Sequence, residues 1–232
     1  MRDRATEHPD PLGATGTNTE QLAYPLVGPF RLLRVELSDP RALRVREAVY
    51  VEEMKYETNS VLRDPLDEKA AHFVATTISG EPVAGMRIIS GRQRPFELES
   101  MATCSELIDQ DPLPAEISRL CISTQFRAVK RRQFVHAGMW KLATDYARVE
   151  GITHYWIWAP LAITAVYEYL GFSQVSGLRF CHPAFNNQMY QVLRLDVRTL
   201  HDEYRRRKHA LSQLLFGDET SEGAAGVISE RA

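Results

Sequence analysis

The chain alternates between short apolar, β-branched runs and longer segments in which apolar residues recur with helical spacing. Short runs bounded by turn residues are typical of β-strands, whereas apolar positions three and four residues apart are typical of amphipathic helices. The pattern predicts strands at 30–37, 72–78, 83–89, 116–123, 152–158, 174–180 and 189–195. It predicts helices from Pro40 to about 58, at 127–150, from Pro160 to Leu170 and at about 197–215.

Turn and cap residues support these boundaries. A Ser-Gly-Glu-Pro sequence at 79–82 separates two predicted strands and has the composition of a hairpin turn. Ser38 or Asp39 can cap the first helix, and Gly151 can end the longest one. A strand, the longest helix and the strand at 152–158 then form a right-handed parallel crossover, while hairpins supply antiparallel neighbours.

We therefore predict an α/β fold of three layers, α/β/α, with helices on both faces of one mixed, mostly antiparallel central sheet. The order β-α-β-β-β-α-β-α-β-β-α resembles the layout of the GNAT (acetyltransferase-like) fold. In a GNAT-like sheet we expect the fourth and fifth strands, 116–123 and 152–158, to splay apart. Since one fold serves many functions, this order alone does not identify an activity.

Both ends of the chain differ from its middle. Residues 1–28 and 217–232 are rich in Gly, Thr, Pro and charged residues and have no hydrophobic period, so we predict that they are disordered tails. Residues 29–216 are predicted to form a single domain.

Composition excludes several classes of function. The 232 residues include 28 Lys and Arg against 30 Asp and Glu, and a net charge of -2 gives no general attraction to nucleic acid. The sequence has no apolar run long enough to span a membrane and no hydrophobic signal segment at its start, which predicts a cytoplasmic protein. Its three cysteines lack the spacing of a zinc site or a disulfide framework, and no spacing indicates a metal, flavin or nicotinamide.

Several polar residues interrupt this apolar framework. Arg46, Tyr50 and Met54 are four residues apart, so a guanidinium and a phenol can line one pocket, although an exposed cation beside a packed ring has the same spacing. Asp64 and Asp67 place two carboxylates on one turn, where they either bind a substrate ammonium, pair with Arg46 and Arg87, or remain solvated. Arg87 lies in an apolar strand and needs a carboxylate partner if it is buried.

Glu116 and Arg119 are three residues apart in a predicted strand and would point to opposite faces if the strand were regular. If both belong to one site, the strand carries a β-bulge, which we predict at 118–120. Such a bulge would release a backbone N–H that can stabilise an oxyanion. The alternative is that Glu116 faces solvent and only Arg119 points inward.

Eight positions together resemble the acyl-homoserine-lactone synthases and the N-acyl amino acid synthases. They are Arg46, Tyr50, Tyr56, Asp64, Asp67, Arg87, Glu116 and Arg119. Tyrosine at positions 50 and 56, His72 and the Glu-Ile-Ser-Arg-Leu sequence are more similar to the N-acyl amino acid synthases. The resemblance covers about residues 30–195 and implies a GNAT-like fold that uses acyl-acyl carrier protein as donor.

The resemblance implies direct transfer of a fatty acyl group, of long chain in our prediction, from the phosphopantetheine arm of acyl carrier protein to the α-amino group of an amino acid, without a bound cofactor. We expect Glu116 to be the general base, directly or through a water, and Arg119 to act with it. The remaining matched residues and His72 would bind substrate. Two alternatives are an acyl-homoserine-lactone synthase that uses S-adenosylmethionine and a non-catalytic module that binds acyl carrier protein.

The start of the longest helix offers a basic patch in place of a glycine-rich phosphate loop. No glycine occurs between Gln125 and Gly138, so backbone binding of a diphosphate is poorly supported. The patch suits an acidic carrier protein, or is a solvated helix face. It consists of Arg127, Lys130, Arg131 and Arg132. A second basic run at 205–208 is interpreted as solvated or as a peripheral membrane contact.

Overall fold

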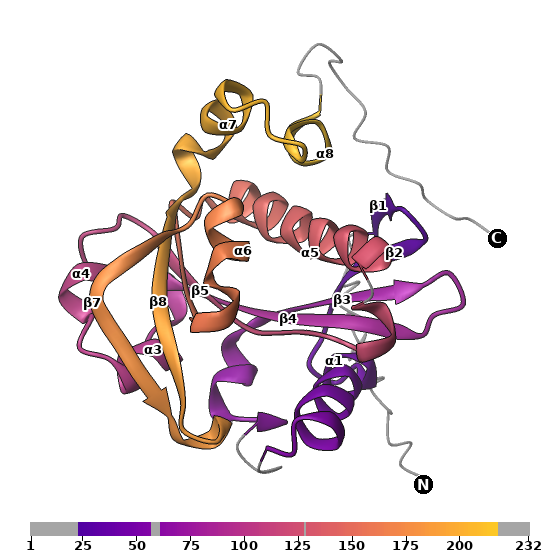
Figure 1. The fold of residues 1–232 in the computed structure, drawn as a ribbon, viewed down its shortest axis with the longest axis horizontal. Helices are drawn as coiled ribbons and strands as arrows, with labels where there is room; N and C mark the ends of the chain where they lie inside the picture. Colours follow the sequence, from indigo (N-terminus) through magenta and orange to yellow (C-terminus); the bar gives the residue numbers. More distant parts are fainter. Residues whose placement is uncertain (1–22, 57–60, 128, 218–232) are drawn as a thin grey trace, which may run out of the picture.

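A computed structural model describes residues 23–56, 61–127 and 129–217 and shows one eight-stranded sheet in the order β1-β2-β3-β4-β5-β6-β8-β7 (Figure 1). All neighbouring strands are antiparallel except β5 and β6. The mixed, mostly antiparallel sheet and the parallel crossover are therefore confirmed. The strands are β1 Ala23–Val27, β2 Phe30–Val35, β3 Ala71–Thr77, β4 Pro82–Ser90, β5 Pro114–Ile122, β6 His154–Pro160, β7 Ser173–His182 and β8 Gln188–Asp196.

The N-terminal boundary of the domain lies earlier than expected. Strand β1 falls inside the segment predicted as a tail, and its Val27 pairs with Phe30 of β2 across a turn at Gly28. Gly28 has a φ of +61°, a conformation that glycine adopts without strain. The segment was missed because β1 is only five residues long and contains Pro25, which is compatible with a strand only at a sheet edge or a bulge. The predicted tails at 1–22 and 218–232 lie outside the described residues.

Helices cover both faces of the sheet, which completes the three-layer architecture (Figure 1). On one face α5 packs against β2, β3 and β4, and on the other α1 packs against β3, β4 and β5. The helices are α1 Pro40–Arg46, η1 Glu47–Glu53, α3 Glu97–Met101, α4 Ser105–Ile108, α5 Val129–Glu150, α6 Thr164–Tyr169, α7 Val197–Arg206 and α8 Ser212–Phe216, with short 3₁₀ turns at η2 Pro65–Lys69, η3 Gly91–Gln93, η4 Thr124–Phe126, η5 Leu161–Ile163 and η6 Pro183–Phe185. In the described residues no helix is long and apolar enough to cross a membrane.

Two predicted helices differ in detail. The first changes from α-helix to π-helix at Glu47, where Met54 N–H bonds the Val49 carbonyl five residues back. π-Helical turns often occur at functional sites. The last predicted helix is two helices, because Lys208 takes a left-handed φ of +50° and ends α7 before α8 begins.

Strands β5 and β6 are hydrogen-bonded to each other only near their first residues. The two strands pair only from Pro114 to Glu116, opposite His154 to Trp156, and then continue apart. Both the predicted splay and the predicted bulge are confirmed. In the bulge, Ser118 faces Arg87 and Cys121 faces Gly85, so two residues of β5 lie opposite one of β4.

Candidate active site

Arg87 is the centre of a buried cluster of charges beside the splay. It points from β4 into the protein with 0% exposure. One guanidinium nitrogen contacts Asp64 at 2.8 Å and Asp67 at 3.2 Å, the other contacts Glu97 at 2.7 Å, and Nε donates to Ser118 Oγ at 2.9 Å. Buried guanidinium groups require such carboxylate partners, so the cluster accounts for an arginine in an apolar strand.

Arg46 extends the cluster toward the first helix. Its Nη1 donates to both carboxylate oxygens of Asp67, at 2.9 and 3.0 Å, and its Nη2 contacts Nδ1 of His72 at 3.3 Å. His72 Nε2 lies 2.9 Å from the Asp67 carbonyl, which fixes the proton on Nε2. Burial lowers the pKa of His72, so the ring stays neutral. Because Arg46 is only 2% exposed, the alternative of an exposed cation is wrong, whereas Tyr50 and Met54 line the cavity described below.

Arg119 closes the cluster from the bulge in β5. Its φ of +54° turns the side chain to the same face as the adjacent Ser118. Arg119 donates to both oxygens of Glu97 at 2.9 Å and to Asp64 at 2.8 Å. In a regular strand, neighbouring residues point to opposite faces, so Glu116 and Arg119 could not reach one site. The bulge therefore brings both side chains to the same side of β5.

Glu97 and His182 belong to the cluster but were not predicted from the sequence. Glu97 begins the short helix α3 and contacts Arg87, Arg119 and, at 3.3 Å, Nε2 of His182. Since Nδ1 of His182 accepts the N–H of Ala184, its proton lies on Nε2 and is donated to Glu97. Charge balance was the available clue, because three buried arginines need a third carboxylate besides Asp64 and Asp67.

Glu116 is the fourth carboxyl group of the cluster and has no cation of its own. It is 0% exposed, so the alternative that it faces solvent is wrong. The Leu98 N–H donates to Oε2 at 2.7 Å, whereas Oε1 is buried without a hydrogen-bond partner. Burial and the nearby charge of Glu97 raise the pKa of Glu116 to about 7. A carboxyl group with this pKa can accept a proton near neutral pH.

An aromatic cavity of about 310 Å³ lies in the splay, next to the cluster. Ser118, Arg119 and Leu120 of the bulge line one wall, and Trp158 of β6 lines the opposite wall. The ring of Phe185 packs against Tyr50, Tyr56 and Trp158 at centroid distances of 5.7, 4.9 and 5.6 Å. A second cavity of about 250 Å³ shares its Tyr50, Met54, Leu120, Ile163 and Tyr167 lining and is mostly apolar.

Residues 41–196 match the family model of the N-acyl amino acid synthase FeeM. The chain belongs to this family. A comparison with curated protein sequences gives no match.

Solved structures with the same fold include FeeM and other acyltransferases. FeeM from uncultured soil microbes is 19% identical with a TM-score of 0.58, covering 80% of this chain and 99% of that one. The acyl-homoserine lactone synthase BjaI, described as CoA-dependent, is 17% identical with a TM-score of 0.52, covering 73% and 82%. A putative N-acetyltransferase from Lactobacillus plantarum is 17% identical with a TM-score of 0.51, covering 73% and 99%. The GNAT-like fold and membership of an acyltransferase family are thus established.

The eight matched positions and His72, predicted from the sequence, lie in one place. Two of these residues, Tyr50 and Tyr56, line the cavity. The others belong to the buried cluster or contact it: Arg46, Asp64, Asp67, His72, Arg87, Glu116 and Arg119. Glu116 is in the cluster but is not among the residues that line the cavity. Any role in proton transfer therefore needs an intermediate group.

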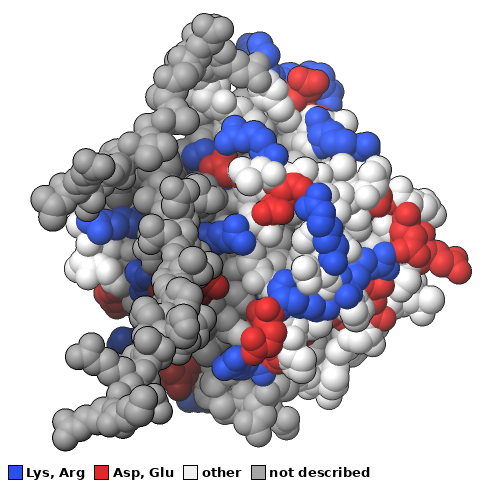
Figure 2. Space-filling view, turned by 180° about the vertical axis from the view of Figure 1, so that it is seen from behind, with Lys and Arg blue, Asp and Glu red and all other residues white. Residues whose placement is uncertain are grey.

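The predicted docking patch is only partly described. Arg127 lines the second cavity, donates Nε to the Ile122 carbonyl at 2.7 Å and pairs with Glu53. The side chains of Lys130, Arg131 and Arg132 lie outside the described part of the chain. On the face seen in Figure 2, Lys and Arg are interspersed with Asp and Glu rather than forming one basic field.

The pKa of Glu97 predicts a loss of stability in acid. Burial opposes its ionisation, but Arg119, His182 and Arg87 lower its pKa to about 2. A lowered pKa in the folded state adds stability above the unfolded value of about 4.3, and this contribution disappears as the pH falls toward 2. We expect the free energy of unfolding to fall by about 3 kcal/mol over this window. Urea unfolding of the wild type and Glu97→Gln at several pH values measures it, and parallel pH curves for the two proteins would contradict the assignment.

Proposed function

We propose that the chain transfers a fatty acyl group from the phosphopantetheine thioester of acyl carrier protein to the α-amino group of an amino acid. The observation that carries this proposal is the cavity in the β5–β6 splay, with the bulge on one side and an aromatic wall on the other. An extended pantetheine arm would fit between diverging strands, whose backbone groups there are not paired with each other. Positioning thioester and amine side by side supplies much of the rate acceleration in such a reaction.

In the proposed reaction the amine nitrogen attacks the thioester carbonyl, a C–N bond forms, the C–S bond breaks and the pantetheine sulfur leaves as a thiolate. The proton lost by the amine goes to Glu116, whose pKa of about 7 suits a base. Ser118 lines the cavity, and its hydroxyl also lowers the pKa of Glu116. Ser118, or a water beside it, therefore passes the proton from the cavity to the buried carboxylate.

The β-bulge supplies the remaining element of the reaction. Attack on the thioester places negative charge on the carbonyl oxygen, and preorganised backbone N–H groups stabilise such charge. Arg119 and Leu120 line the cavity at the position where the β5 ladder is interrupted. We assign the oxyanion site to the backbone of these two residues.

A covalent acyl-enzyme step through Cys121 is disfavoured. Burial raises the pKa of this thiol to about 11, whereas a nucleophilic cysteine needs a lowered pKa. Cys121 lines the second, apolar cavity as a packing residue. Direct transfer to the amine is therefore the simpler mechanism.

Mass spectrometry of lipid extracts tests the proposed function. We expect a bacterial host expressing the wild type to contain new ions at the masses of fatty acyl amino acids, which are absent with Glu116→Gln. The masses of these ions identify both the acceptor amino acid and the length of the acyl chain. Acyl-homoserine lactones instead would indicate the synthase that uses S-adenosylmethionine, and identical extracts from both strains would contradict acyl transfer and favour a carrier-binding module.

The donor is tested with purified protein. We expect faster turnover with palmitoyl-acyl carrier protein than with palmitoyl-CoA at equal concentration, because the start of α5 has no glycine-rich segment for the CoA diphosphate. Equal or faster turnover with palmitoyl-CoA would show that the donor assignment is wrong while leaving acyl transfer intact.

A further inference from the structure

Three buried side-chain atoms in the described part of the chain have no hydrogen-bond partner, and all three belong to the splayed strands. They are Oε1 of Glu116, Nε of Arg119 and Nε1 of Trp158. A buried polar group without a partner costs about 1–3 kcal/mol, so native proteins have few of them. Arg119 and Trp158 line the aromatic cavity, and Glu116 lies behind it next to Ser118. Unpaired donors on two residues that line one cavity indicate groups that a ligand satisfies.

The positions of these residues follow the shape of the splay. Glu116 stands opposite Trp156 at the last paired position of β5 and β6. Arg119 lies further along β5 and Trp158 further along β6, so the three residues occupy the apex and the two arms of the opening. The Phe185 ring contacts both arms, with its centroid 5.3 Å from the Arg119 guanidinium carbon and 5.6 Å from the Trp158 ring.

The unpaired atoms are two N–H donors and one carboxyl oxygen. Both terminal nitrogens of Arg119 are bonded to Asp64 or Glu97, so Nε is the guanidinium nitrogen that has no partner. The Trp158 indole is a donor that cannot accept a hydrogen bond. Two donors match a carboxylate, and Glu116, reached through Ser118, can take a proton from an amino group, so the set is complementary to an α-amino acid.

We propose that Trp158 Nε1–H and Arg119 Nε–H bind the carboxylate of the acceptor and thereby orient its amino group toward Ser118, the relay to Glu116. This inference rests on the proposed N-acyl transfer and identifies Trp158 as a specificity-determining residue. Neither donor atom is open to solvent, so the acceptor reaches them when side chains at the cavity move. Tyr56 and Gln188 line this cavity, and their hydroxyl-to-amide contact of 3.5 Å is long and exposed, so it breaks easily.

An oxyanion site is the competing assignment for the two donors. If they bound the thioester oxygen, removing one would lower kcat for every acceptor. If they bind the carboxylate, removing one raises KM for acceptors that have a carboxylate and has little effect on those that lack it. Amino acids and their α-amides distinguish these cases, because the amide has no negative charge at that position.

The experiment uses the full-length protein, palmitoyl-acyl carrier protein and two acceptor mixtures, the proteinogenic L-amino acids and their α-amides. We expect the wild type to acylate free amino acids at least tenfold more efficiently than the amides. For the amino acid that gives most product, Trp158→Phe should raise KM by roughly tenfold or more, the value of one charge-assisted hydrogen bond, with no comparable change for its amide.

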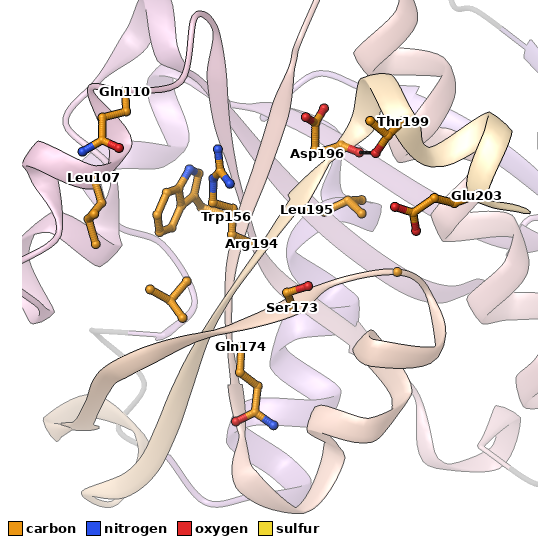
Figure 3. Close-up of a pocket in the computed structure, with 12 residues that line it drawn as sticks. Leu107, Gln110, Trp156, Ser173, Gln174, Arg194, Leu195, Asp196, Thr199 and Glu203 are labelled. Carbon is orange, nitrogen blue, oxygen red and sulfur yellow. Dashed lines mark hydrogen bonds between the residues drawn. The ribbon is translucent and has the colours of Figure 1, made fainter.

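Trp156→Phe is the matched control. Trp156 lies two residues earlier in β6, where its indole N–H donates to Asp111 at 2.8 Å, and it lines a different cavity beside Arg194 (Figure 3). This variant should keep the preference for free amino acids.

Each contrary outcome has a distinct meaning. Amides that are as good as amino acids for the wild type, or a fall in kcat shared by both acceptors in Trp158→Phe, would overturn the carboxylate assignment while acyl transfer stands. The wild-type comparison needs no variant, so it remains decisive if Trp158→Phe folds poorly. No acylated product from either mixture would instead count against the proposed function and, with it, this inference.

Discussion

Glu116→Gln is expected to lower kcat by about a hundredfold to ten-thousandfold while leaving the affinity for acyl carrier protein unchanged. Glutamine keeps the shape of the side chain and can still accept the Leu98 N–H, but it cannot take a proton from the amine. In the wild type the rate should rise with pH and level off above about 7, because the carboxyl must be ionised to act as a base. Steady-state kinetics across pH, with carrier-protein binding measured separately, checks both expectations.

Glu99→Gln is the control for this prediction. Glu99 lies two residues after Glu97 on α3 and pairs with Arg94, away from the aromatic cavity. Its activity and pH profile should match the wild type within a few-fold. Retention of full activity by Glu116→Gln, with the inflection near pH 7 unchanged, would remove Glu116 from the proton path.

Arg87→Met is expected to lower the free energy of unfolding by about 3–5 kcal/mol. Methionine fills part of the volume but leaves Asp64, Asp67 and Glu97 without their shared cation, inside a cluster in which Asp67 and Glu97 are buried and Asp64 is half-buried. Removing one partner of a buried ionic cluster is far more costly than removing a surface pair, because the remaining charges stay buried. Urea unfolding at neutral pH measures the difference.

Arg63→Met provides the comparison. Arg63 precedes Asp64 in the chain, but its side chain is 55% exposed and pairs with an exposed Glu68. The change in free energy of unfolding should be below about 1 kcal/mol. If Arg87→Met were as mild as Arg63→Met, the cluster would not contribute to the stability of the sheet.

The local pattern was sufficient for most of the architecture. Period-two and helical spacing act within a few neighbouring residues, so the strands from β2 to β8 and the α5 crossover were predicted close to their observed bounds. The bulge also followed from local geometry, since Glu116 and Arg119 can reach one site only if β5 is irregular between them. The edge strand β1 and the π-helical turn were not predicted, because each depends on packing against the rest of the fold.

The amino-acid sequence by itself determined the kind of fold and most members of the charged cluster, because a buried arginine in an apolar strand demands carboxylates wherever they come from. Only the tertiary structure decided which carboxylates those are. Glu97 and His182 are 85 residues apart and meet through the folding of α3 against the β7–β8 hairpin. The same folding pairs three arginines with three carboxylates and leaves Glu116 as a fourth carboxyl group without a cation of its own. Burial and the nearby charge of Glu97 then raise the pKa of Glu116 to about 7, an effect that no local sequence pattern records.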